Sequence, residues 1–146
     1  MPSTFSCLNY HIVFATKFRQ PLLRPPLLHR MHEYLGGCIR QIGATPLQIG
    51  GIEDHVHILA RLKPTHCVAD VLRSIKKGSS DWARSTVWSF QWQDGYSAFT
   101  VSPSHVERVT RYIATQAEHH HRTTFEDEYR ALLAEHGIEY DERFVL

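Results

Sequence analysis

Two histidines separated by a single residue, His55 and His57, are the first side chains whose spacing points to chemistry. In a β-strand, residues i and i+2 project from the same face, so the two imidazoles are expected side by side. The apolar residues of the same stretch alternate with them and should pack on helices, namely Ile52, Val56, Ile58, Ala60 and Leu62. Paired imidazoles on the opposite, open polar face suit a divalent cation with further ligands from elsewhere. The alternative is a solvated polar face without a metal.

Tyr112 and Gln116 form the second candidate pair, because a spacing of four puts both on one stripe of a helix predicted over residues 104–119. His120 is the next residue on that stripe and could support the site or contact a phosphate. A tyrosine hydroxyl can attack a phosphodiester, but its ordinary pKa of about 10 makes it a poor nucleophile. A metal at the histidine pair could polarise the phosphate, so the two candidates need each other. The alternative for Tyr112 is a packing role.

Basic residues are concentrated in the first half of the chain, although the net charge is only +1. Residues 1–77 hold ten Lys/Arg and four Asp/Glu, whereas residues 78–146 hold six Lys/Arg and eleven Asp/Glu. Such a basic half can present a surface for phosphates, and the alternative is an ordinary solvated surface. The candidate DNA contacts are Lys17, Arg19, Arg24, Lys63, Lys76 and Lys77. Trp82, Trp88, Trp92 and Tyr96 could stack on bases or pack in the core.

The elements that must position these residues follow from periodicity and turn signals. Strands are predicted over 8–17, 47–51 and 55–62, with helices over 27–42 and 68–82. Alternating Trp88, Phe90 and Trp92 predict a strand that turns at Asp94-Gly95 into a strand over 96–101. A capping box of Ser104 and Glu107 should open the helix over 104–119. A last helix over 125–136 has Thr124 as its cap and Gly137 as its end, and an acidic tail follows.

This order is that of the α+β, ferredoxin-like βαββαβ fold. Both of its helices cover one face of the sheet, and the other face is open, as in RNA-recognition modules. The helix over 104–119 follows the last strand and could lie beside that second face. The chain of 146 residues suits a single domain over 1–146. Its core is expected over about 8–102, with the tyrosine helix over about 104–119 and a helical tail over 120–146.

Composition narrows the class of protein further. Hydrophobic residues make up 42% of the chain and charged residues 21%, which is typical of globular domains. Neither a membrane helix nor a signal peptide is evident, so a cytoplasmic protein is expected. The odd, widely spaced Cys7, Cys38 and Cys67 argue against disulfides and favour buried, reduced thiols. No phosphate-binding glycine loop is evident, so no nucleotide cofactor is expected.

Five stretches together carry a resemblance to a known family: HIVFATKFR at 11–19, GGIEDHVHIL at 50–59, WQDGYSAFTVS at 92–102, YIATQAEHHHR at 112–122 and YDERFVL at 140–146. The sequence resembles the single-tyrosine HUH transposases of small bacterial insertion sequences, including the REP-associated tyrosine transposases. The resemblance implies a ferredoxin-like fold, a homodimer and cleavage and rejoining of single-stranded DNA. It also implies that the protein recognises DNA hairpins at the ends of the element.

The resemblance also assigns roles to individual residues. His55 and His57 match the histidine ligands of a divalent ion, Mg²⁺ or Mn²⁺, and Gln116 matches the third ligand. Tyr112 matches the nucleophile, which becomes linked to a DNA 5′-phosphate and releases a 3′-hydroxyl. Active sites in this family can be composite, with the histidines from one subunit and the tyrosine helix from the other.

Two alternatives to a tyrosine transposase remain. The first is a binding protein with an RNA-recognition-like fold that holds single strands or hairpins without cutting them. The second is a metal-dependent hydrolase that uses water, with Tyr112 in a structural role. The two enzymes differ in whether a covalent protein–DNA species forms.

Overall fold

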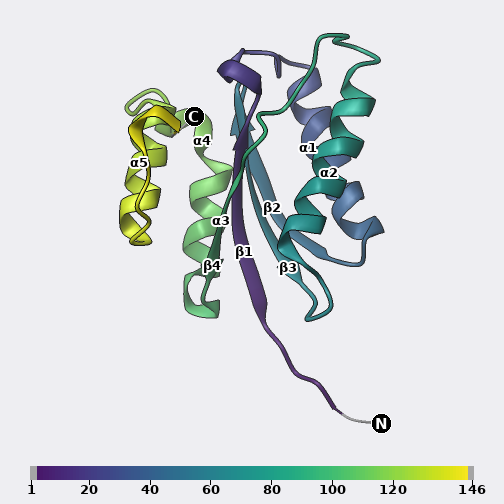
Figure 1. The fold of residues 1–146 in the computed structure, drawn as a ribbon, viewed down its shortest axis with the longest axis vertical. Coiled ribbons are helices and arrows are strands. Elements are labelled where there is room, and N and C mark those ends of the chain that lie inside the picture. The colour runs from purple at the N-terminus through teal and green to yellow at the C-terminus, as the bar shows by residue number, and fades with distance from the viewer. Residues whose placement is uncertain (1–2, 145–146) are drawn as a thin grey trace.

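The computed structural model describes residues 3–144 (Figure 1). Its four strands are β1 (Leu8–Ala15), β2 (Thr45–Ile52), β3 (His55–Leu62) and β4 (Ser97–Val101). They form one antiparallel sheet in the order β2-β3-β1-β4. With α1 (Leu27–Gln41) after β1 and α2 (Val68–Ala83) after β3, this is the predicted ferredoxin-like arrangement.

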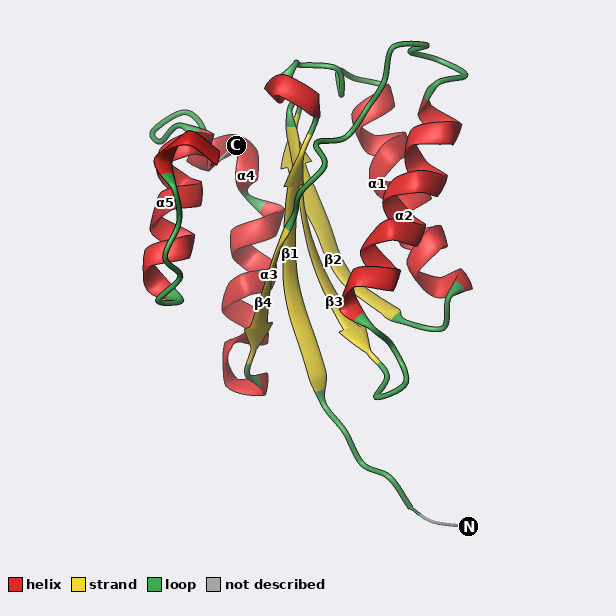
Figure 2. Cartoon of the chain, viewed as in Figure 1, coloured by secondary structure: helices red, strands yellow, loops and turns green. Residues whose placement is uncertain are grey.

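The main core lies between the sheet and the pair α1 and α2 (Figure 2). Its sheet side is the predicted alternating set, in which Val56, Ile58 and Ala60 of β3 are joined by Ile12 and Phe14 of β1. The side chains between them face the other way, so the alternation along β3 that predicted the direction of the two histidines is confirmed.

The second face of the sheet is covered rather than open, which corrects the expectation from the sequence. It carries α3 (Val106–Ala114), α4 (Gln116–His119) and α5 (Phe125–Glu135) (Figure 1). The physical reason is that this face is itself partly apolar. Leu59 packs with Ile113 of α3, and Val13 packs with Phe125 of α5. A solvated face would leave these groups in water.

The segment before β4 does not form the predicted strand and hairpin. It makes a single isolated bridge, between Trp92 and Thr16, and otherwise runs as a loop. Phe90 and Trp92 alternate because both are buried in the main core. The Trp92 indole donates to Ser79 Oγ at 2.9 Å, so this ring is not free to stack on a base. Lys76 holds this loop in place of the hydrogen bonds that a hairpin would make. Its Nζ atom donates to the carbonyl oxygens of residues 93, 94 and 95.

The other two tryptophans of the stacking hypothesis differ in exposure. Trp82 already stacks on Tyr34, with ring centroids 4.5 Å apart, whereas Trp88 is 85% exposed. Tyr96 is 37% exposed. Only Trp88 and Tyr96 of this set therefore present open ring surface.

The helix predicted over 104–119 is divided in two. Thr115, with φ −110° and ψ 28°, separates α3 from α4. The predicted capping box is wrong, because the Ser104 hydroxyl lies near Ser102 and His105 in a 3₁₀ turn, Pro103–His105, instead of capping a helix. The prediction for α5 is confirmed: the Asp127 N–H donates to Thr124 Oγ1 at 3.2 Å.

Two further expectations concern thiols and membranes. Cys7 and Cys67 are exposed and Cys38 is half-buried, all three as free thiols, so the prediction of buried thiols is wrong for the first two. Within residues 3–144, no helix has the length and apolar character needed to cross a bilayer.

Candidate active site

Strand β3 places both histidines of the pair on the covered face of the sheet. His55 and His57 are each 0% exposed, and their ring centroids lie 5.1 Å apart. Each ring is also held at its Nδ1 atom. His55 Nδ1 donates to Asp54 Oδ1 at 2.8 Å, and His57 Nδ1 lies 2.8 Å from His11 Nε2 of β1. Both Nε2 atoms therefore point away from these partners and toward α4 and α5.

Helices α3 and α4 bring the second candidate pair to the histidines. Tyr112 lies near the end of α3, with its ring centroid 5.6 Å from that of His57. Gln116 begins α4 and is buried, and its Oε1 atom lies 3.2 Å from His55 Nε2. His120 Nε2 lies 3.1 Å from the same amide oxygen. The structure thus brings together all five residues that the sequence singled out for the site.

Glycine at position 50 allows α3 to approach the sheet this closely. Gly50 of β2 is paired with His57. A Cβ atom at this position would lie 2.2 Å from the main-chain oxygen of Ile113, the residue that follows Tyr112. The missing side chain therefore sets the distance between the tyrosine helix and the histidine strand.

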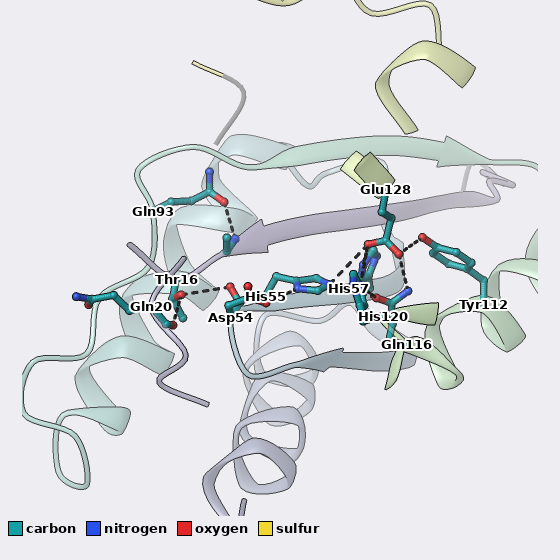
Figure 3. A network of polar contacts seen from close by, with 11 residues as sticks. Thr16, Gln20, Asp54, His55, His57, Gln93, Tyr112, Gln116, His120 and Glu128 are labelled. Atoms are coloured by element: carbon teal, nitrogen blue, oxygen red, sulfur yellow. Dashed lines mark hydrogen bonds and ion pairs between the residues drawn. The ribbon is translucent and has the colours of Figure 1, made fainter. Parts of the chain in front are cut away.

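Glu128 of α5 is the site residue that sequence reasoning missed. It is 7% exposed, and its Oε1 atom accepts a hydrogen bond from His57 Nε2 at 3.0 Å. The other oxygen, Oε2, accepts from the Tyr112 hydroxyl and from Gln116 Nε2, the latter at 3.2 Å (Figure 3). A signal was present in the sequence. Glu128 lies in the apolar stripe of its helix, which otherwise consists of Phe125, Tyr129, Leu132 and Leu133.

The donor atoms of the site fit a divalent cation. Atoms of His55, His57 and Glu128 all lie within 4.8 Å of one another. Because His55 donates its proton from Nδ1 to Asp54, its Nε2 carries a lone pair. Gln116 donates from its nitrogen to Glu128, so its oxygen faces His55, and two lone pairs meet across 3.2 Å. A cation between nitrogen and oxygen ligands of this kind would relieve that contact.

Burial and the Glu128 carboxylate set the electrostatics of the site. Burial lowers the pKa of His57 to about 4 against the opposing effect of Glu128, so this imidazole is neutral. To bind a cation through Nε2, the ring would carry its proton on Nδ1, which faces His11 Nε2, instead of donating it to Glu128. Burial would raise the pKa of Glu128, but hydrogen bonds from His57 and Tyr112 lower it to about 2. Burial and the neighbouring carboxylate both raise the pKa of Tyr112. Its hydroxyl therefore stays protonated until a substrate or cation changes these surroundings.

Two cavities lie near the candidate residues. One, of about 720 Å³, is bounded by α3, α5 and the sheet, and its lining includes Tyr112, Glu128 and Arg108. It gives access to the tyrosine. The second, of about 510 Å³, lies beside α2 and contains Lys17, Lys76 and Lys77 of the predicted DNA contacts.

Two arginines that the sequence did not single out, Arg73 and Arg84, also line the second cavity. The other three predicted DNA contacts lie outside it. Arg19 lies 3.7 Å from Glu126, Arg24 donates to the Pro21 carbonyl at 3.2 Å, and Lys63 lies beside Gly43.

The ferredoxin-like sheet carries a buried cluster whose donor atoms fit a cation, and comparison with known families gives the class of protein. The family model described as "Transposase IS200 like" matches residues 4–116. The chain therefore belongs to the IS200-like transposase family, whose members are DNA-processing enzymes. Glu128 lies beyond the matched stretch.

The chain is also similar to individual proteins and, in fold, to solved structures. The ISDra2 transposase TnpA of Deinococcus radiodurans is 23% identical over 117 residues, which cover 75% of this chain and 84% of that protein. A crystal structure of a candidate transposase from Deinococcus radiodurans R1 is similar in fold, with a TM-score of 0.65 and 24% identity over 80% of this chain and 95% of that one. A REP-associated tyrosine transposase bound to a REP hairpin has a TM-score of 0.63 and 12% identity, over 82% and 72% of the two chains.

Proposed function

We propose that this transposase cleaves and rejoins single-stranded DNA through a covalent bond between Tyr112 and a DNA 5′-phosphate. The observation that carries the proposal is the convergence of four residues. The Tyr112 hydroxyl, the two buried imidazoles and the Gln116 amide meet in one cluster, reached through the cavity beside α3. A tyrosine with only a packing role would need neither a cavity beside its ring nor neighbouring side chains whose atoms can bind a cation.

The proposed reaction breaks one phosphorus–oxygen bond for each one that it forms. The Tyr112 oxygen forms a bond to phosphorus while the bond from phosphorus to the 3′-oxygen breaks, and the phenolic proton is balanced by the proton on the released 3′-hydroxyl. Rejoining is the reverse attack by a 3′-hydroxyl, so no nucleotide cofactor is needed. When bound by His55, His57 and Gln116, a divalent ion such as Mg²⁺ or Mn²⁺ would stabilise charge on the phosphate. Asp54 and His11 orient the two imidazoles.

The proposed partners are single-stranded DNA and DNA hairpins. The hairpin bound to the REP-associated relative supports this choice. The cavity beside α2 supports it too, since Lys17, Lys76 and Lys77 lie there with two arginines, and such a surface binds phosphates irrespective of sequence. We further propose a cytoplasmic protein of one domain that forms a homodimer.

The binding protein without catalysis is less well supported. It requires an open sheet face for single strands, and α3 and α5 cover that face. The water-using hydrolase needs the same histidines. It differs from the proposed enzyme only in that Tyr112 forms no covalent bond to DNA.

A denaturing gel tests the proposal directly. Wild type, Tyr112→Phe and Tyr140→Phe would be incubated with Mn²⁺ and single-stranded DNA from both flanks of the gene. We expect a slow-migrating covalent adduct with wild type and with Tyr140→Phe, because Tyr140 is exposed and lies outside the cluster. EDTA should abolish the adduct, and Tyr112→Phe should bind DNA without forming it. Cutting without an adduct would favour the hydrolase, and binding alone would favour the binding protein.

A further inference from the structure

We propose that Glu128 is a catalytic residue that joins the nucleophile to the metal ligands, with one carboxylate oxygen directed at each. This role deepens the proposed function and rests on Tyr112 as the nucleophile. It assigns part of the active site to α5, which lies outside the residues that the family model matches.

The two oxygens of Glu128 have separate partners. Oε1 lies 3.0 Å from His57 Nε2, 3.6 Å from His55 Nε2 and 3.4 Å from His120 Nε2, so it points at the candidate cation position. Oε2 accepts from the Tyr112 hydroxyl (Figure 3). A single rigid carboxylate therefore fixes the position of the attacking oxygen relative to the metal ligands. Such positioning is worth most when the geometry is preset before the substrate arrives.

The same oxygen that holds the tyrosine also orients a ligand. Gln116 Nε2 donates to Oε2 at 3.2 Å, which turns the amide oxygen toward His55. Partners that orient a ligand in this way commonly change metal affinity by about 10–100-fold when they are removed. Glu128 thus acts on the metal site through Gln116 and through its own Oε1 atom, and on the nucleophile directly.

Helix α5 is anchored on both sides of Glu128, which gives the carboxylate a fixed place. One turn before it, Phe125 stacks on His55, with centroids 3.7 Å apart and an interplanar angle of 6°. One residue after it, Tyr129 bonds to Ser97 of β4, and Leu133 continues the apolar contact with the sheet. An ion-pairing glutamate on the surface would need no such anchoring. The packing of α5 indicates that this helix is part of the active site and not merely a C-terminal extension.

The test compares Glu128→Gln with Asp127→Asn, which removes the same charge from an exposed neighbour. The first measurement is Mn²⁺ affinity by calorimetry without DNA, and the second is the rate of adduct formation at saturating Mn²⁺. We expect Glu128→Gln to weaken Mn²⁺ binding by about 10–100-fold and also to slow the adduct step at saturating metal. Asp127→Asn should change neither. Thermal unfolding of each variant checks that the fold is intact.

Glu128→Asp separates the two contacts and guards against a folding defect in the glutamine variant. It keeps the charge but shortens the side chain by one methylene, so it cannot reach both partners. We expect Mn²⁺ affinity to recover more than the adduct rate. Wild-type affinity and rate in Glu128→Gln would overturn the proposal, as would a faster adduct step, which would mean that Glu128 restrains the tyrosine. If wild type itself forms no adduct, the proposed function fails, and the Mn²⁺ titration alone judges the contact of Glu128 with the ligands.

Discussion

His55 Nε2 and Gln116 Oε1 face each other at 3.2 Å, and with the ring proton of His55 on Nδ1 neither atom has a proton to offer. Asp54 creates this situation because its carboxylate accepts from His55 Nδ1 and so fixes the tautomer of the ring. The sequence predicted the histidine pair and Gln116, since local spacing decides which side chains share a face. It did not predict Glu128, because residues 71 positions apart meet only through the packing of α5 on the sheet.

Asp54→Asn tests the tautomer argument at the scale of one residue. An amide can present its nitrogen as well as its oxygen to the imidazole, so it no longer holds the proton on Nδ1. Mn²⁺ affinity, measured by calorimetry, should fall by about 10–100-fold. Glu53→Gln is the control, because it removes a charge from the exposed neighbouring position. Equal affinities in the two variants would show that Asp54 does not orient the ligand.

At the scale of elements, the spacing of apolar residues predicted strands and helices well wherever it followed a single strand or helix period. Strand β3 and helices α1 and α2 each present one clear apolar face, and the sequence located all three. The segment around Trp92 failed because its aromatic residues alternate for a different reason: they are anchors of a loop held by Lys76. Residues far away in the sequence decide whether a buried aromatic residue belongs to a strand or anchors a loop in the core. The local sequence pattern carries no information about those residues.

Gly50→Ala tests how β2 positions the tyrosine helix. The added Cβ would meet the main-chain oxygen of Ile113 at 2.2 Å, and a backbone atom cannot move aside as a flexible side chain can. We expect a loss of about 1–3 kcal/mol in the free energy of unfolding, measured with urea, and a slower adduct step as Tyr112 shifts.

Gly37→Ala provides the matched control for that substitution. A Cβ at Gly37 meets nothing within 4 Å, and the residue lies inside α1. Alanine should therefore stabilise the protein by about 0.5–1 kcal/mol and leave the adduct step unchanged. Wild-type stability in Gly50→Ala would mean that α3 does not rest on this glycine.

At the scale of the whole molecule, one chain supplies every residue of the candidate site. The order of strands and helices predicted the ferredoxin-like topology, because few folds accommodate that order. It allowed the helix over 104–119, now α3 and α4, to lie beside the second face, but it did not predict that α5 would cover that face too. Their placement there joins Tyr112 to Glu128 and Glu128 to His57 of the same chain. The composite site between two subunits implied by the family resemblance is not needed to assemble these residues, and it stays a prediction.

Co-expression of two inactive variants distinguishes a site within one chain from a composite one. Tyr112→Phe keeps the metal ligands, whereas His57→Ala keeps the nucleophile, and each alone should form no adduct. If each site is made by a single chain, as the contacts of Glu128 favour, the mixture remains inactive on the denaturing gel. If the sites are composite, random pairing restores about a quarter of them, because half of the dimers are mixed and each holds one intact site. An adduct in the mixture would therefore show that α3 exchanges between subunits, whereas its absence, with both variants binding DNA, would locate catalysis within one chain.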